Sequence, residues 1–265
     1  MDANGASNGN GTGPLGSLSG AVLSLPAGVV RAGADITCTF TNANNGISGV
    51  VFNDGGAPSG GVNSGTPNDG LRNGAEAGLG GVAVSLTNCG STVHASTTTD
   101  AGGAFSLALP TAQSGQPVCV SAAAGSARLA TGANAAGTVL PDGSATAVGG
   151  TTFTYTRSTG QVAFTAPASG SVVLNFGAVP VSTLSPATSA RDAGLGLKGV
   201  HTHTFTAGTG GSLQVQLGAG TTTPPLAGWT ETAYLTDCTN PGVVAPGATR
   251  LYPSGAAVTV TQGQV

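Results

Sequence analysis

Charged side chains are scarce in this sequence. Asp, Glu, Lys and Arg make up 6% of the 265 residues and the formal net charge is −3, whereas an ordinary soluble domain is roughly 25% charged. There is one lysine and one tryptophan. Because so few cations leave no basic surface for nucleic acid or anionic lipid, we expect no polyanionic partner. Solubility must come instead from Ser, Thr, Asn and Gly.

Long apolar runs are also missing. No stretch approaches the roughly 20 apolar residues of a membrane-spanning helix, so we expect no membrane insertion in this segment. The first residues, MDANGASNGNGTGP, have neither the basic start nor the apolar middle of a signal peptide. Because the chain begins in polar residues and ends on the strand-like alternation AVTVTQGQV, we interpret it as a segment of a longer protein.

Helical periodicity is nearly absent, and strand-like alternation replaces it. The 46 glycines and 15 prolines punctuate short apolar runs at intervals typical of β-sandwiches. The sequence therefore predicts an all-β fold of tandem antiparallel β-sandwiches with almost no helix. Strands are predicted at 36–42, 47–53, 81–86, 104–109, 117–121, 152–156, 161–166, 171–177, 201–207, 212–217 and 257–261.

The spacing of these strands divides the chain into four sections. Residues 1–43 carry one or two strands, too few for a core, and are interpreted as the C-terminal strands of a preceding sandwich. Residues 44–179 hold enough strands to close a domain. Prolines and short side chains over 180–196 predict an extended linker, and residues 197–265 supply the first strands of a further sandwich.

The cysteines follow this division. Cys89 and Cys119 lie at the ends of predicted strands within the second section, and they predict a disulfide worth roughly 3 kcal/mol by loop entropy. We expect Cys38 and Cys238, in the flanking sections, each to pair with a cysteine beyond the ends of this chain. The alternative is two free buried thiols. The absence of C-x-x-C argues against a zinc site, and the set favours an oxidising compartment.

Carboxylates gather in one glycine-rich loop. Asp69, Gly70, Asn73 and Glu76 match positions 5, 6, 9 and 12 of an EF-type calcium loop. Asp54 can replace the missing first ligands if the intervening residues loop outward. Because three neighbouring carboxylates repel each other without a cation, the sequence predicts a weak calcium site that stiffens the join between the first and second sections. The alternative is a solvated loop, since Gly, Asn and Asp tolerate positive φ.

Two motifs in the second section resemble the SdrD B-like repeat of bacterial surface proteins. NDGLRNGAEAGLGGVAVSL (Asn68–Leu86) is similar to the acidic loop and following strand of that family, and TTTDAGGAFSL (Thr97–Leu107) to its next turn. LNFGAVP (Leu174–Pro180) resembles the closing strand. The resemblance implies a prealbumin-like sandwich. This chain departs from the family pattern at the insertion after Asp54 and at Asn73, where the family usually has Asp.

The resemblance also bears on cross-linking and on the flanks. Related Cna B-type domains are stabilised by a Lys–Asn isopeptide bond, but the one lysine, Lys198, lies outside this section. The Cys89–Cys119 bridge is expected to take over that role. DITCTFTNAN in the first section, and HTHTFTAGTGGSLQVQL and GWTETAYLTDC in the last, resemble the Ig-like repeats that accompany such domains.

The sequence contains no catalytic constellation, and we expect no enzyme. GASNG and GTGPLG satisfy glycine-rich motifs by chance, because neither sits between a strand and a helix. His201 and His203 share one face of a predicted strand, but no third metal ligand lies nearby in the sequence, and a solvent-facing polar pair is the simpler interpretation. Trp229 and three tyrosines could form a sugar-binding platform, although lone aromatics in sandwiches usually belong to the core.

The resulting expectation is a non-catalytic stalk, adhesin or fibre module of a secreted or cell-surface bacterial protein. Its partners would be neighbouring domains of the same polypeptide, and further candidates are a host or matrix protein, a glycan or like subunits. Two alternatives stay open. One is a carbohydrate-binding module of a larger secreted enzyme, and the other is an extracellular filament subunit assembled by strand addition.

Overall fold

The computed structural model describes residues 45–56, 65–74, 76–123, 125–192, 197–217, 230–236, 238–253, 255 and 257–265, and the backbone of 17–19 and 22–24. The chain divides into two compact units, Met1–Ala43 and Asn44–Val265. In the first unit, β1 (Ser17–Ser19) pairs with β2 (Val22–Ser24). The predicted domain boundaries stay predictions.

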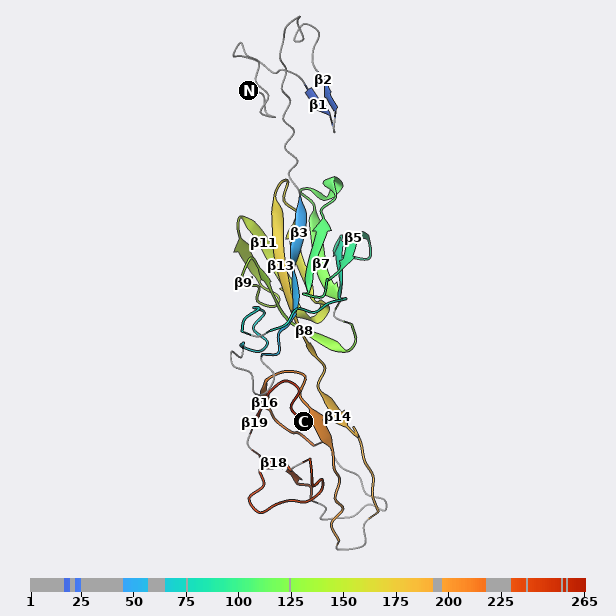
Figure 1. Cartoon of the computed structure of the whole chain (residues 1–265), viewed down its shortest axis with the longest axis vertical. Helices are drawn as coiled ribbons and strands as arrows, with labels where there is room; N and C mark the ends of the chain where they lie inside the picture. The colour runs from blue at the N-terminus through green and yellow to red at the C-terminus, as the bar shows by residue number, and fades with distance from the viewer. Residues whose placement is uncertain are drawn as a thin grey trace, which may run out of the picture. The chain divides into compact units, whose positions relative to one another are not determined.

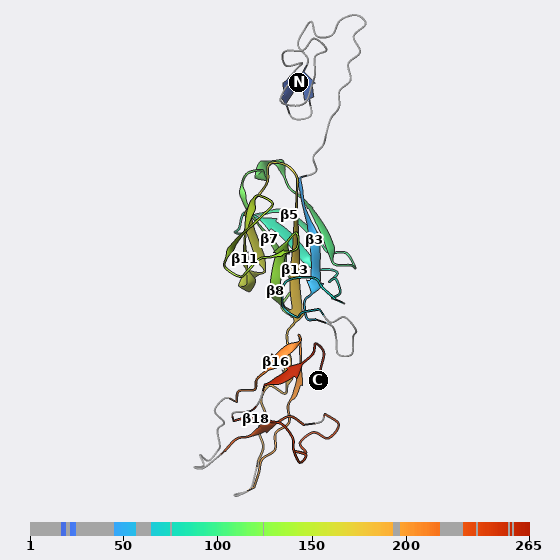
Figure 2. The same cartoon turned by 90° about the vertical axis from the view of Figure 1, so that its left-hand side faces the viewer.

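Two β-sheets face each other in the second unit, so the predicted all-β fold is confirmed (Figures 1 and 2). The six-stranded sheet has the order β10 (Ala145–Val148), β11 (Thr151–Thr156), β12 (Gln161–Thr165), β7 (Pro117–Ala123), β4 (Ala83–Thr87), β5 (Val93–Thr98). The five-stranded sheet has the order β6 (Ala104–Ala108), β3 (Gly46–Asn53), β13 (Ser171–Pro180), β8 (Arg128–Ala135), β9 (Thr138–Val139).

Alternating apolar residues build the core between the sheets. On β6, Phe105 and Leu107 are buried while their neighbours are exposed, as a period of two requires. Phe105 packs on Phe176 of the same sheet, and Phe153 packs on Phe164 of the other, with ring centroids 6.3 and 5.2 Å apart. Full burial of each such side chain contributes about 1.5–3 kcal/mol.

The first and last strands of the sandwich, β3 and β13, lie side by side and run parallel (Figure 1). Ser171 lies opposite Gly46 and Ala178 opposite Asn53, so the register holds along nearly the whole of β3. This is the one parallel pair among the described strands; the other ladders are antiparallel. The chain therefore enters the sandwich at one end and leaves it at the other.

The turn TTTDAGGAF is fixed by one carboxylate and by close glycine contacts. Asp100 Oδ1 accepts hydrogen bonds from the backbone N–H groups of Gly102 and Ala104, each 2.8 Å long. Gly103 has a φ of +80°, and a Cβ there would lie 2.3 Å from the carbonyl oxygen of Val51. Only glycine fits such a position. This part of the family-like motif therefore has a structural role.

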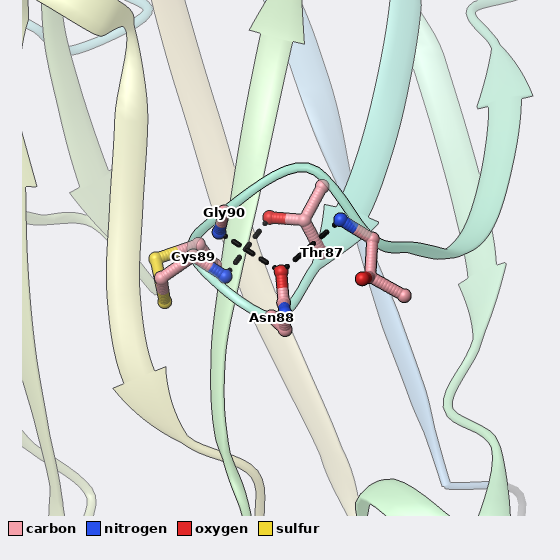
Figure 3. Close-up of a disulfide and its surroundings, with 6 residues drawn as sticks. Thr87, Asn88, Cys89 and Gly90 are labelled. Atoms are coloured by element: carbon pink, nitrogen blue, oxygen red, sulfur yellow. Dashed lines mark hydrogen bonds between the residues drawn. A yellow bond between two sulfur atoms is a disulfide. The ribbon is translucent and has the colours of Figure 1, made fainter.

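The predicted Cys89–Cys119 disulfide is confirmed. It joins the β4–β5 turn to strand β7, with Cα atoms 4.8 Å apart, within the normal range of about 4.4–6.8 Å. Thr87 Oγ1 accepts a hydrogen bond from the N–H of Cys89, and Asn88 Oδ1 accepts one from Gly90 (Figure 3). Cys238 is an exposed free cysteine among the described residues, whereas Cys38 lies outside them.

Three short strand pairs follow the sandwich. β14 (Thr183–Ser185) pairs with β15 (Thr204–Thr206), β16 (Gly211–Leu213) with β19 (Val258–Val260), and β17 (Ala233–Tyr234) with β18 (Arg250–Tyr252). We call residues 197–265, with their undescribed gaps, the C-terminal section. In the described part of the chain the helices are single 3₁₀ turns, η1 (Thr111–Gln113) and η2 (Arg157–Thr159), and none is long and apolar enough to span a membrane.

Candidate functional site

The predicted carboxylates converge at the end of β3. Asp54 follows this strand directly, and Asp69, Asn73 and Glu76 come from the loop that leads towards β4. We call residues 54–56, 65–74 and 76 the acidic loop. Asp54 is fully buried and Glu76 is 5% exposed. Buried carboxylates need hydrogen-bond donors or a cation, so their partners decide what the loop can do.

Asp54 is held by three donors. Its Oδ1 accepts a hydrogen bond of 3.3 Å from the N–H of Asp69, and its Oδ2 accepts one of 3.0 Å from the N–H of Gly70. The hydroxyl of Thr131, on β8, donates to the same Oδ2. Gly177 on β13 leaves room for this group, because a Cβ there would lie 2.5 Å from Asp54 Oδ2. The carboxylate therefore ties the loop to strand β8 of the five-stranded sheet.

The remaining carboxylates also bond to nitrogen donors. Glu76 accepts from the N–H groups of Gly56 and Asn73, at 3.2 and 3.0 Å. Asp69 accepts from the N–H of Leu71 and from the side-chain amide of Asn73, each at 2.8 Å. Much of the negative charge in the described arrangement is thus offset by N–H dipoles.

A ladder of amides anchors the acidic loop to the sheet. Asn134 donates to the carbonyl oxygen of Gly70 at 2.7 Å and accepts from Asn175 at 2.9 Å. Asn175 in turn accepts from the N–H of Val50 on β3. At Gly132 a Cβ would lie 2.6 Å from the Cα of Gly70. The loop therefore packs directly on backbone, and Asn134 is buried.

Burial governs the electrostatics of this site. Loss of hydration raises the pKa of Asp54, while the hydrogen bonds from Thr131 and Gly70 oppose the increase. Loss of hydration also raises the pKa of Glu76, the hydrogen bonds from Asn73 and Gly56 oppose it, and the charges of Asp54 and Asp69 add to it. The negative charge of Asp69 therefore disfavours the ionised forms of both Asp54 and Glu76.

The calcium prediction can be compared with these contacts. Carboxylate and amide oxygens are the ligands that calcium takes, so the chemistry of the residues is suitable. Their arrangement is less suitable for calcium, because the same oxygens accept hydrogen bonds from N–H groups. The described residues also contain no group of three His, Cys, Asp or Glu side chains placed to hold a metal ion. A calcium ion would have to replace several of these hydrogen bonds. The site stays a prediction.

The acidic loop also contacts the C-terminal section. The side chains of Asn53 and Gln262 exchange two hydrogen bonds, and Gln262 donates a third to the carbonyl oxygen of Gly208. The N–H of Gly210 donates to the carbonyl oxygen of Gly55, and Thr209 donates to the side chain of Asn68. These contacts, none of which involves a charged side chain, lie on the C-terminal side of the sandwich. The sequence-based expectation concerned the join on its N-terminal side, which stays a prediction.

Other sequence-based candidates have different surroundings. Tyr155 is a core residue, 1% exposed, and its hydroxyl has no hydrogen-bond partner. His201 and His203 are both exposed and contact Ser189. Trp229, the centre of the suggested sugar-binding platform, lies outside the described residues.

Comparison with known proteins adds no relatives. No protein-family model matches the chain, and no curated protein matches it. The resemblance to SdrD B-like repeats therefore rests on the sequence motifs alone and stays a prediction.

Proposed function

We propose that this chain is a non-catalytic structural segment, a stalk or fibre module, of a secreted or cell-surface bacterial protein. The observation that carries the proposal is the parallel pairing of β3 with β13. Because the chain enters at the start of β3 and leaves at the end of β13, consecutive modules can follow one another in line. The Cys89–Cys119 bridge supports an oxidising environment outside the cell.

The contacts beyond β13 support a stiff module. Two neighbouring compact parts of a chain usually move relative to each other unless their interface is extensive. Here Asn53, Gly55 and Asn68 all form hydrogen bonds to the C-terminal section. Gly55 and Asn68 belong to the acidic loop, Asn53 directly precedes it, and Asp54 anchors the loop to the sheet. Calcium at the acidic loop belongs to the same proposal, as an ion that would add to this stiffness.

The test is the rotational diffusion of the full chain, measured by NMR relaxation of backbone amides. We expect the residues of the sandwich and of β15, β16 and β19 to report one common, anisotropic tumbling tensor. Separate tensors for the two parts would contradict a stiff stalk. Gly55→Ala is the matched variant: the new Cβ would lie 2.4 Å from the side-chain nitrogen of Gln262, so that side chain must turn away and should lose its hydrogen bonds to Asn53, which weakens the coupling of the parts.

A second candidate is a filament subunit joined by strand addition, and it is favoured by the edges of the sheets. The edge strands β5, β6, β9 and β10 contain no Asp, Glu, Lys, Arg or Pro, although natural edges are usually protected by charge or proline. Sedimentation over a wide concentration range tests this candidate. Association that disappears in Ser96→Lys, on the β5 edge, favours the filament, and a monomer at every concentration rejects it.

A further inference from the structure

Two histidines converge on one hydroxyl group beside β15. Ser189 Oγ lies 2.7 Å from Nδ1 of His201 and 3.1 Å from Nε2 of His203. His203 Nδ1 is hydrogen-bonded to the backbone carbonyl oxygen of Pro186. The three side chains are exposed. The chain has only three histidines, so the meeting of two at one atom needs an explanation.

For neutral imidazole rings, the hydrogen bonds determine which nitrogen carries the proton. A carbonyl oxygen can only accept, so Nδ1 of His203 carries the proton, and Nε2 of the neutral ring presents its lone pair to Ser189. Ser189 has one hydroxyl proton and gives it to His203. Nδ1 of His201 must then be the donor to Ser189 Oγ. Both ring nitrogens therefore point at the same position in space.

We propose that His201 and His203 form a binding site for a divalent transition-metal ion of the imidazole-preferring class, with Zn²⁺ as the reference ion. Histidine ligands in metal sites usually donate their other ring N–H to a carbonyl or carboxylate, as His203 does to Pro186. Imidazole suits zinc, copper and nickel, whereas calcium takes oxygen ligands. This site is separate from the acidic loop and does not depend on the proposed stalk function.

The geometry requires small movements only. A zinc–nitrogen bond is about 2.1 Å long, so an ion at the hydroxyl position needs the two ring nitrogens to move closer by about 0.6 and 1 Å. The ion displaces the Ser189 hydroxyl, and His201 transfers its proton from Nδ1 to Nε2, which is a change of tautomer without net proton release. Water completes the coordination, because all three side chains are exposed. With two protein ligands the affinity should be below that of a closed four-ligand zinc site.

The test is a calorimetric titration of the full chain with ZnCl₂, after the free thiols have been alkylated so that Cys38 and Cys238 cannot bind metal. We expect one saturable site per chain, no corresponding heat with CaCl₂, and loss of zinc binding in both His201→Ala and His203→Ala. His94→Ala is the matched control and should bind as the unaltered chain does. Ser189→Ala should bind at least as tightly, because a competing hydrogen bond is gone.

Three results would overturn the proposal. One is the absence of saturable zinc binding at millimolar metal. Another is binding that survives in the double variant His201→Ala/His203→Ala or is lost equally in His94→Ala. The third is a nitrogen spectrum in which zinc leaves the resonances of His203 Nε2 and His201 Nδ1 unchanged. The proposal expects His203 to be protonated at Nδ1 without metal, and both of those resonances to shift when zinc is added. Unchanged melting of each variant shows that loss of binding is not loss of fold.

Discussion

The side-chain amides of Asn53 and Gln262 face each other and exchange two hydrogen bonds, each 2.8 Å long. The two residues are 209 positions apart in the chain. A reciprocal amide pair uses both the donor and the acceptor of each side chain, so its geometry is fixed more closely than that of a single hydrogen bond. It holds the end of β3 against the segment that follows β19.

Gln262→Ala should loosen the C-terminal section without unfolding the sandwich. The change removes three side-chain hydrogen bonds, and each contributes about 0.5–1.5 kcal/mol. We expect amide hydrogen exchange to become faster at Ala207, Gly210 and Gly263, while protection in β7 and β12 is unchanged. Gln214→Ala, which alters an exposed glutamine of the same section, is the control. Equal effects of both variants would contradict a specific clamp.

Tyr155→Phe should leave the protein as stable as before or make it more stable. The ring fills the core, but its hydroxyl is buried without a partner, and an unsatisfied buried polar group costs about 1–3 kcal/mol. Phenylalanine keeps the packing and removes that cost. Urea unfolding at neutral pH measures the difference. A clear loss of stability would show that the hydroxyl bonds to a buried water molecule.

The raised pKa of Tyr155 should lower the free energy of unfolding in alkali. Burial is the main cause that raises the pKa of Tyr155 to about 12 from 10.0, and the positive charge of Arg157 opposes it. Because the folded-state pKa is the higher one, ionisation of this tyrosine favours the unfolded chain. The free energy of unfolding is therefore unaffected below pH 10 and falls as the pH rises towards about 12. Two pKa units correspond to about 2.7 kcal/mol, an order-of-magnitude figure. The fall in stability should be smaller in Tyr155→Phe than in the unaltered chain.

Removal of the disulfide should destabilise the sandwich selectively. Cys89 and Cys119 are 30 residues apart, and closing a loop of that length contributes roughly 3–4 kcal/mol in the chain-entropy account. The Cys89→Ser/Cys119→Ser variant should therefore melt at a lower temperature, whereas Cys238→Ser should melt like the unaltered chain. Alkylation without reductant, followed by mass spectrometry, should leave Cys89 and Cys119 unmodified; labelling of both in folded protein would reject the bridge.

Calcium should raise the melting temperature only if it replaces the hydrogen bonds of the acidic loop. Extracellular calcium modules bind at about 10⁻⁴–10⁻³ M, and a ligand at about 100 times its dissociation constant adds roughly 2.7 kcal/mol. Melting of the full chain in EGTA and in an excess of calcium measures this. If the melting temperature does not change, or changes equally in Glu76→Gln, the loop is held by its N–H donors alone.

Strands with large alternating side chains were predictable, and strands built from small residues were not. PVCVS and QVAFT alternate Val, Phe and small residues, and they became β7 and β12. RLATGANA forms β8, but five consecutive residues of it are buried because the acidic loop covers its other face. Burial on both faces removes the alternation on which the prediction depends. VHASTT in β5 has too few apolar residues to be recognised.

The candidate site was predictable in its local part only. The spacing of Asp69, Asn73 and Glu76 indicated one loop, and these residues do bond to one another. Thr131 and Asn134 are 77 and 64 residues from their loop partners. Their positions follow from the register of β8 against β13, which no local motif encodes.

The parallel pair formed by β3 and β13 has a mechanical consequence. If the chain is pulled from both ends, the two strands are drawn in opposite directions along their own axes. Their inter-strand hydrogen bonds are then loaded together, in shear, and cannot open one after another as they would in a hairpin pulled from its open end. The eight residues of β3 and the ten of β13 share this load. When the sandwich is extended by force, its main resistance should therefore come from the hydrogen bonds between these two strands.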